Sequence, residues 1–392
     1  MTFLLSLAPF TILYNCSMYL LFSFFGMIKA ISILAFVFYH KSLASFIDNT
    51  KPRKDVHGSL MDIHDGNIVK WSTGENLFHW YGMGYQDCEL EKGIIPPRNC
   101  PGIYGEFGIH CGFRADHAVN LYTSPDLENW TFVRNILPID DRPDGIYFRP
   151  KVIYNRRTSE YVMWINFLPP ADTPLESYPK AVLMVAASNS SRGPFRIVTN
   201  KAEIESSGGG DFSLMVDPND DVDTAYIAYD AWGNNHAIVI EKLTSDYYDS
   251  LGGSTSTGTI TPTNNEAPIL FERKGWYYLL YGHTCCFCEQ GSGAEVWAAQ
   301  HPLGPWVNLN LDINPRSFGT RTIKAQCNYV ITLEHKDKEK DYLYTGDLWS
   351  SSLDNLKSHD LQYWSPPLVF DDLSVPPLIT PMTFTKNFTI TI

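Results

Sequence analysis

One pattern recurs five times along this chain, and it constrains the fold more than any other feature of the sequence. Each copy consists of a short apolar strand, a polar turn, an aromatic-rich strand, a loop and a further strand. Short strands rich in β-branched and aromatic residues that are joined by tight turns pair as antiparallel meanders. The repeat therefore predicts five similar sheets, whose first two strands cover residues 67–70 and 77–82, 151–154 and 161–165, 212–216 and 225–229, 268–271 and 276–281, and 328–332 and 342–345.

Five similar meanders are typical of an all-β, five-bladed β-propeller, in which each meander is one blade. A β-sandwich also has many short strands, but it does not account for closing turns that recur at matching points of separate units. Such turns occur at Gly193-Pro194-Phe195 and again at Gly304-Pro305-Trp306. No long linker interrupts the repeats, so we expect a single propeller domain over residues 45–392.

The N-terminal segment has the features of a targeting sequence. Residues 2–39 are almost wholly apolar, with Lys29 near their middle, where a charge would be costly in a bilayer. From Met27 onward, a basic start, an apolar run over 30–39 and small residues at 42–44 have the order of a signal peptide. We expect residues 1–44 to be a signal peptide or a signal anchor, and residues 1–26 to be an over-extended start if the signal begins at Met27. The domain is then exported, and only an uncleaved leader would hold it at a membrane.

Cysteines and sequons point to the same compartment. Seven of the eight cysteines follow the leader, which suits disulfide formation in an oxidising compartment and leaves one cysteine unpaired. Beyond the leader, Asn-X-Ser/Thr sequons lie at Asn129, Asn189 and Asn387. We therefore expect a glycoprotein that is secreted or held in the lumen of the secretory pathway. The cluster around Cys286 lacks the spacing and the second cysteine pair of a zinc site.

Three acids are placed where a propeller would bring them together. Asp65, Asp211 and Glu266 each come just before the first strand of their copies, where the second copy has Phe148 or Arg149. The innermost strands of all blades face one axis, so acids at one register position would share a cavity and raise one another's pKa. Glycoside hydrolysis needs one protonated and one ionised carboxyl group. The three acids are predicted to be catalytic, although each could instead cap a turn.

Several segments in this order resemble glycoside hydrolase family 43, especially its branch related to exo-β-1,3-galactanases. The resemblance covers roughly residues 62–370 and rests most clearly on the segments around Arg149-Pro150-Lys151, Glu266-Ala267-Pro268 and Gly346-Asp347-Leu348-Trp349. It implies a glycosidase that inverts the anomeric configuration. Carried over by position, Asp65 is the general base, Asp211 sets the pKa and orientation of the acid, and Glu266 is the general acid.

The chain departs from that branch at two positions. The branch has no acid at the first-blade site, where this chain has Asp65, and it uses a fifth-blade Gln that resembles Gln326 to assist the water. Phe148 stands where the branch carries a Glu that holds sugar hydroxyls, which argues against a simple galactan substrate. With Asp65 present, Gln326 is expected to bind substrate, as are His64 and Arg149.

The expected function is hydrolysis of O-glycosidic bonds in a polysaccharide or glycan of galactan, arabinan or xylan type. No cofactor is expected to be required, and a structural cation on the propeller axis stays an open alternative. The protein is expected to be a monomer. Nucleic acid is not expected as a partner, because a net charge of -13 repels phosphate backbones. The alternatives are a non-catalytic carbohydrate-binding propeller and a transferase or lyase on the same scaffold.

Overall fold

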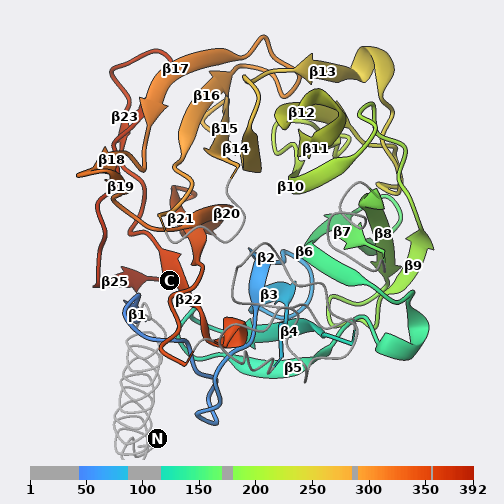
Figure 1. The fold of residues 1–392 in the computed structure, drawn as a ribbon, viewed down its shortest axis with the longest axis vertical. Helices are drawn as coiled ribbons and strands as arrows, with labels where there is room; N and C mark the ends of the chain where they lie inside the picture. The colour runs from blue at the N-terminus through green and yellow to red at the C-terminus, as the bar shows by residue number, and fades with distance from the viewer. Residues whose placement is uncertain (1–43, 87–115, 170–179, 285–289, 355) are drawn as a thin grey trace, which may run out of the picture. The chain divides into compact units, whose positions relative to one another are not determined.

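A computed structural model describes residues 44–86, 116–169, 180–284, 290–354 and 356–392. Residues Ser45–Ile390 form one compact unit. Five antiparallel sheets stand around a common axis as the blades of a β-propeller (Figure 1). The predicted all-β, five-bladed propeller is confirmed.

Each blade is built from consecutive strands of the chain. Blade 1 has β2 (His64–Lys70), β3 (Phe78–Met83), β4 (Val119–Ser124) and β5 (Thr131–Asn135), and blade 2 has β6 (Ile146–Asn155), β7 (Glu160–Leu168), β8 (Val182–Ser188) and β9 (Arg196–Thr199). Blade 3 has β10 (Gly209–Val216), β11 (Ala225–Ala231), β12 (Ala237–Lys242) and β13 (Ser256–Thr259). Blade 4 has β14 (Asn265–Arg273), β15 (Trp276–His283), β16 (Glu295–Ala299) and β17 (Val307–Asp312), and blade 5 has β20 (Gln326–Glu334), β21 (Lys340–Leu348) and β22 (Leu361–Trp364).

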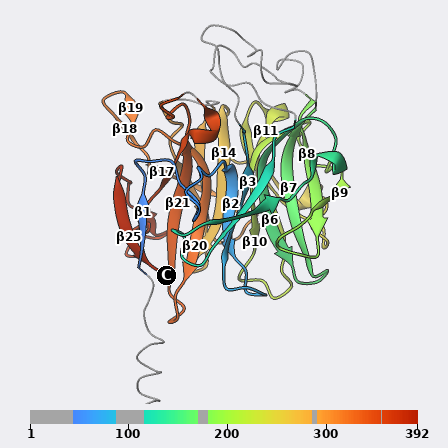
Figure 2. The same ribbon diagram turned by 90° about the horizontal axis from the view of Figure 1, so that it is seen from below.

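The first strand of each blade is its innermost strand, and these five strands form a closed ring. β2 contacts β6, β6 contacts β10, β10 contacts β14, β14 contacts β20, and β20 contacts β2. Figure 2, a side view, has β2, β10, β14 and β20 near its middle. The ring brings the starts of strands that lie far apart in the sequence to one place.

Apolar cores fill the spaces between adjacent blades. Trp164, Phe212 and Tyr229, for example, belong to one core between blades 2 and 3. Side chains alternate between the two faces of a strand, so a strand covered on both faces by neighbouring blades is apolar throughout. This burial explains why the inner strands stand out so clearly in the sequence.

The sequence repeat predicted three strands in each unit, whereas blades 1 to 4 have four. The outermost strands are mostly exposed or only partly buried, so they carry no apolar pattern that could reveal them. Of the two Gly-Pro turns, one precedes β9 and the other precedes β17. These turns therefore lead into the fourth strand rather than closing the blade.

The expectations for the leader and the disulfides fall outside the described residues, which exclude residues 1–43, 87–115 and 285–289 and with them seven of the eight cysteines. Cys327 is buried and is a free thiol within the described part of the chain. None of the helices in that part is both long and apolar enough to span a bilayer. The smaller two-stranded sheets are β1 (Ala44–Asp48) with β25 (Asn387–Thr391), β18 (Arg316–Ser317) with β19 (Thr320–Arg321), and β23 (Phe370–Asp371) with β24 (Leu378–Ile379).

Candidate active site

All five inner strands contain a β-bulge near their N-terminal ends. A bulge places an extra residue in one strand, bends that strand and re-aims the side chains beside it. Because it recurs in every blade, the bulge turns the first residues of all five strands out of the regular ladder. The pairing is interrupted between His64 and Asn67, Phe148 and Lys151, Gly209 and Phe212, Glu266 and Ile269, and Cys327 and Tyr329.

The three acids occupy three different positions of this bulge. The first residue that pairs normally after the bulge is Asn67 in β2, Phe212 in β10 and Ile269 in β14. Asp65 lies two residues before it, Asp211 lies one and Glu266 lies three. The expectation that the acids share one register position is therefore wrong. In other blades the position of Glu266 is taken by His64, Phe148 and Gln326.

The acids nevertheless come together around Arg149 and Gln326. The Gln326 side-chain Nε2 donates to Glu266 Oε1 at 2.6 Å and to Asp211 Oδ2 at 3.2 Å. Arg149 Nε lies 2.6 Å from Asp211 Oδ1, and Arg149 Nη2 lies 3.7 Å from Asp65 Oδ1. Every blade supplies one residue of this cluster, so the structure brings together five of the six site residues predicted from the sequence.

Asp65 is held by hydrogen bonds on both its side chain and its main chain. Its Oδ2 accepts a hydrogen bond from the Tyr85 hydroxyl at 3.1 Å, and its main-chain N–H donates to Asp347 Oδ2 at 3.3 Å. Burial raises the pKa of Asp65, and the neighbouring Arg149 guanidinium opposes that rise. Its φ of 59° is in the left-handed region, which non-glycine residues rarely adopt and which recurs at functional sites.

His64, the sixth predicted residue, lies behind Asp65 and has no exposed surface. Its Nδ1 lies 3.2 Å from Asp347 Oδ1 and 3.2 Å from Gln362 Nε2. Burial lowers the pKa of His64, but the hydrogen bond and the charge of Asp347 outweigh burial and leave the pKa raised. In this structure His64 is placed to orient Asp347, and through it the main chain of Asp65.

The amide of Gln326 has a fixed orientation. Its Oε1 accepts a hydrogen bond from Trp349 Nε1 at 2.9 Å, so its Nε2 faces the two carboxylates. Both Gln326 and Trp349 are buried. The amide therefore serves as a rigid donor to Glu266 and Asp211.

An apolar wall borders the site on the side of blade 2. Phe148 is 9% exposed and packs in a cluster with Tyr85, Trp349 and Met83. Because Phe148 has the same register position as Glu266 and Gln326, it stands where other blades place polar side chains. A sugar that meets this wall receives van der Waals contact there instead of a hydrogen bond from the phenyl ring.

A buried ammonium group lies next to the carboxylates. Lys151 Nζ donates to the main-chain oxygens of Asp65, Gly66 and Asn328, each at 3.2 Å, and to Asn328 Oδ1 at 2.9 Å. Burial and the nearby Arg149 lower the pKa of Lys151 to about 7. Carbonyl oxygens are also the ligands of hard metal ions, and here they are occupied by the ammonium. No cluster of three or more His, Cys, Asp or Glu residues suited to a metal occurs in the described ranges.

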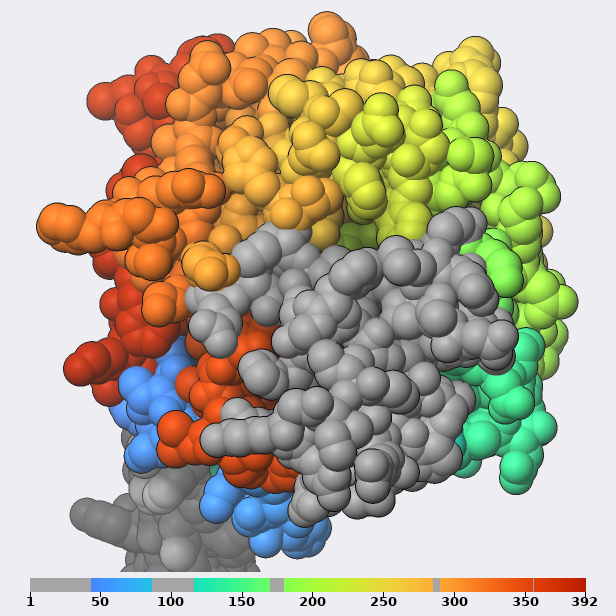
Figure 3. All heavy atoms as spheres, viewed as in Figure 1, coloured from blue at the N-terminus to red at the C-terminus, as the bar shows by residue number. Residues whose placement is uncertain are grey.

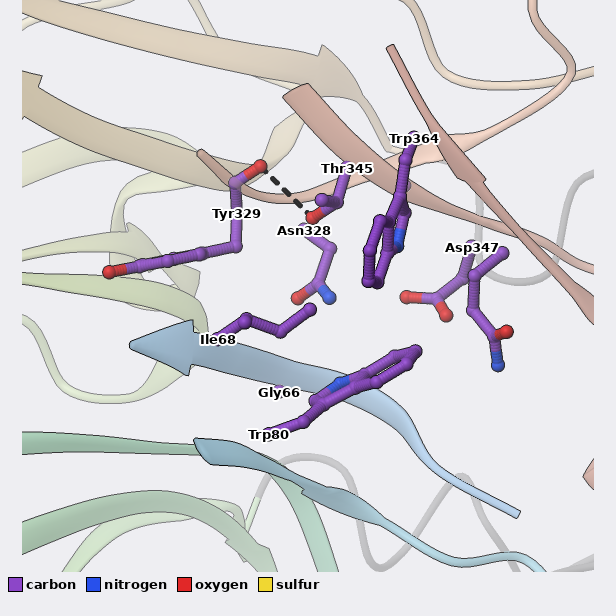
Figure 4. Close-up of a pocket in the computed structure, with 10 residues that line it drawn as sticks. Gly66, Ile68, Trp80, Asn328, Tyr329, Thr345, Asp347 and Trp364 are labelled. Atoms are coloured by element: carbon purple, nitrogen blue, oxygen red, sulfur yellow. Dashed lines mark hydrogen bonds between the residues drawn. The ribbon is translucent and has the colours of Figure 1, made fainter. Parts of the chain in front are cut away.

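A small cavity between blades 1 and 5 adjoins Asp347 (Figure 4). Trp80 and Trp364 form its apolar side, and Asn328 and Asp347 supply polar groups. Its volume of about 10 Å³ is close to what one water molecule needs. The cavity is too small for a sugar, so it is not the substrate-binding site.

The sequence did not identify Tyr85 or Asp347 as site residues. Asp347 lies in a segment that carries the family resemblance but does not match the pattern of the three acids, and Tyr85 follows the second strand of blade 1 without any repeat to mark it. Tyr85 bonds to Asp65 within blade 1, whereas Asp347 bonds to residues more than 280 positions away. Only the closed ring of blades reveals such contacts.

Comparison with known families decides the assignment. The sequence model described as glycosyl hydrolases family 43 matches residues 107–313, which is more than half of the chain. This chain belongs to glycosyl hydrolase family 43. As a family 43 protein it is a glycosidase, and the predicted family and enzyme class are confirmed. None of the proteins with curated descriptions matches it.

Solved structures share the fold of this family 43 glycosidase. An exo-β-1,3-galactanase from Phanerochaete chrysosporium is 23% identical with a TM-score of 0.63, over 86% of this chain and 67% of that one. An exo-β-1,3-galactanase from Clostridium thermocellum is 22% identical with a TM-score of 0.64, over 83% of this chain and 63% of that one. An endo-1,4-β-xylanase from Bacteroides thetaiotaomicron is 17% identical with a TM-score of 0.55, over 83% of this chain and 95% of that one. At these identities the structural likeness supports the fold alone.

Proposed function

We propose that this glycosidase hydrolyses a polysaccharide or glycan of galactan, arabinan or xylan type with inversion of the anomeric carbon. The observation that carries the proposal is the cluster in which Asp65, Asp211 and Glu266 meet around Arg149 and Gln326. Glycoside hydrolysis needs two carboxyl groups in different protonation states on opposite sides of the bond. The cluster supplies carboxyl groups in clearly different surroundings.

Glu266 is proposed as the general acid. It is 5% exposed, and its Oε1 accepts the hydrogen bond from Gln326. We propose that its other oxygen, Oε2, carries the proton to the leaving group. Asp211 shares the same Gln326 amide and pairs with Arg149, so it places negative charge close to Glu266. Negative charge nearby favours the protonated form of a carboxyl group, which a general acid requires.

Asp65 is proposed as the general base. The Tyr85 hydroxyl and the Arg149 guanidinium both favour its ionised form, whereas burial opposes that form. An ionised carboxylate can take a proton from a water molecule that attacks the anomeric carbon from the face opposite to Glu266. Single displacement of this kind inverts the configuration, and it needs a separation of about 6.5–9.5 Å between the two carboxyl groups.

The substrate class rests on the site and on the named relatives. The similar solved structures include galactanases and a xylanase. Phe148 provides an apolar wall where a polar side chain would hold a hydroxyl group, so we propose a substrate whose sugar presents a C–H face there. We further propose that the protein acts as a monomer in the secretory lumen or outside the cell, which the exposed sequons at Asn129, Asn189 and Asn387 support.

The test is hydrolysis of galactans, arabinans, xylans and aryl glycosides by the full chain, with NMR detection of the first anomer released. We expect wild type to release the inverted sugar and both Glu266→Gln and Asp65→Asn to lower kcat by at least about 10²-fold. The matched control is Glu334→Gln, an exposed residue at the far end of β20. Release of the retained anomer would refute Asp65 as base. Binding of a glycan without any hydrolysis would favour the carbohydrate-binding alternative.

A further inference from the structure

Two consecutive residues beside the cluster have an unusual backbone conformation. Asn235 and His236 have φ values of 54° and 61°, both in the left-handed region. They connect the short 3-10 helix Trp232–Asn234 to β12. Such conformations cost free energy in non-glycine residues and persist only where the surroundings fix them. Main-chain hydrogen bonds within blade 3 and to the next blade hold this pair.

Hydrogen bonds attach this segment to the start of β14. Asn264 N donates to Asn235 O at 2.9 Å, and Asn265 N donates to His236 O at 2.8 Å. Asn265 immediately precedes Glu266, the proposed general acid. Blades 3 and 4 lie side by side in the ring (Figures 1 and 3). His236 is thus fixed at the seam between the blade of Asp211 and the blade of Glu266.

The imidazole of His236 is oriented by a buried acid. Its Nδ1 lies 2.9 Å from Asp230 Oδ2 and 3.1 Å from Asp230 Oδ1. The Asp230 side chain is 4% exposed, whereas that of His236 is 37% exposed. Within the described residues, His236 Nε2 makes no hydrogen bond to the protein. The buried acid therefore fixes the ring and leaves the outer nitrogen for a ligand.

The surrounding residues make room for this pair. A Cβ atom at Gly210 would come within 2.6 Å of Asp230 Oδ2 and 2.0 Å of Trp232 Nε1. Gly210 immediately precedes Asp211, so the Asp230 carboxylate packs directly against the main chain that carries a proposed catalytic acid. The Trp232 and His236 rings have centroids 5.5 Å apart. Between them these residues present a polar nitrogen beside a partly exposed aromatic ring.

The charges of the pair suit a neutral ligand. Burial raises the pKa of Asp230 to about 6, and the hydrogen bond from His236 opposes that rise. The hydrogen bond to Asp230 raises the pKa of His236. A pair of an imidazolium and a carboxylate has no net charge, and the imidazolium still offers one N–H donor at Nε2. A sugar matches this combination of groups when its C–H face packs on the aromatic ring and one of its hydroxyl groups meets the nitrogen.

We propose that Asp230 and His236 form a recognition site for the sugar on the leaving-group side of the scissile bond, with His236 Nε2 bonded to a hydroxyl group of that sugar. This inference rests on the proposed function, because it takes Glu266 as the acid that protonates the leaving oxygen. The leaving sugar lies next to that acid, and His236 is attached to the main chain directly before it. Asp230 is a positioning residue that acts through His236.

The experiment compares substrates with and without a sugar as leaving group. His236→Asn keeps a residue type that tolerates the left-handed conformation, so the fold should be retained. For a trisaccharide that wild type cleaves, among β-1,3-galactotriose, xylotriose and arabinotriose, we expect kcat/KM to fall about tenfold, mainly through KM. For the 4-nitrophenyl glycoside of the same sugar we expect a change of less than about twofold. Asp230→Asn should give the same pattern more weakly.

Binding separates this inference from the proposed function. Each trisaccharide is titrated calorimetrically into the full chain carrying Glu266→Gln, with and without His236→Asn. Weaker binding in the double variant supports the site even if wild type hydrolyses none of the sugars, in which case only the proposed function fails. The inference is wrong if the double variant binds as tightly as its parent, if no trisaccharide binds, or if His236→Asn slows the aryl glycoside as much as the trisaccharide.

Discussion

The surroundings of Asp65 have opposite effects on its protonation. It is buried, which favours its protonated form, yet a base must be ionised to act. Arg149 and Tyr85 supply the positive charge and the hydrogen bond that keep the carboxylate usable. The balance lies on the side of burial, since the pKa of Asp65 is raised. The raised pKa of Asp65 therefore leads to a prediction of how activity depends on pH.

We expect kcat/KM to fall as pH decreases through the raised pKa of Asp65. The acidic limb of the pH profile should therefore lie above the ordinary pKa of an Asp side chain, about 3.9. Arg149 lowers this pKa, so Arg149→Met should move the limb to higher pH. The measurement is kcat/KM on an aryl glycoside between about pH 3 and pH 8, with circular dichroism to verify folding. Arg192→Met, at an exposed ion pair with Glu75, is the control. A limb that stays in place or moves to lower pH would contradict the assignment of Asp65.

At the scale of elements, the inner strands could be predicted and the bulges could not. Inner strands are buried on both faces, so their apolar runs repeat visibly along the chain. A bulge leaves no such trace, because it depends on how the partner strand pairs. For this reason the sequence placed Asp65, Asp211 and Glu266 near the axis correctly but gave them the wrong register. The sequence did not predict a role for Asp230 and His236, because the position of His236 depends on hydrogen bonds to the main chain of the neighbouring blade.

The bulge in β2 depends on Gly66. A Cβ atom at this position would lie 1.5 Å from the main-chain oxygen of Tyr81 in the partner strand β3. Backbone cannot move aside as a side chain can, so the clash must open the β2–β3 pairing next to Asp65. Overpacking of this kind costs about 1–3 kcal/mol or more.

Gly66→Ala should therefore lower the free energy of unfolding by about 1–3 kcal/mol and reduce kcat, since Asp65 is the next residue. Urea unfolding and initial rates measure the two effects. Gly208→Ala is the matched control, because a Cβ there meets only Trp232 Cβ at 3.5 Å, an ordinary contact. If both variants were equally stable, the close approach in β2 would not be needed for the bulge.

At the scale of the whole molecule, the cluster around Arg149 and Gln326 needs a closed ring. Its five residues come from five blades, so opening any seam would separate them. Outer contacts close the seam between blades 5 and 1, where the Asn49 side chain both donates to Trp364 O and accepts from Trp364 N. At the axis, Lys151 of blade 2 bonds to main-chain oxygens of blades 1 and 5. One buried side chain thus joins three blades directly below the proposed base.

Lys151→Met should show how far the ring depends on this contact. The substitution keeps the length of the side chain but leaves three buried carbonyl groups without their donor, and each orphaned group costs about 1–3 kcal/mol. We expect the free energy of unfolding to fall by at least about 3 kcal/mol, and hydrogen exchange to rise first in β2 and β20. Lys324→Met, an exposed lysine just before β20, should change neither. A Lys151→Met protein as stable as wild type would mean that the apolar cores between blades close the ring unaided, and that the ammonium serves only to balance the charges of Asp65 and Asp347.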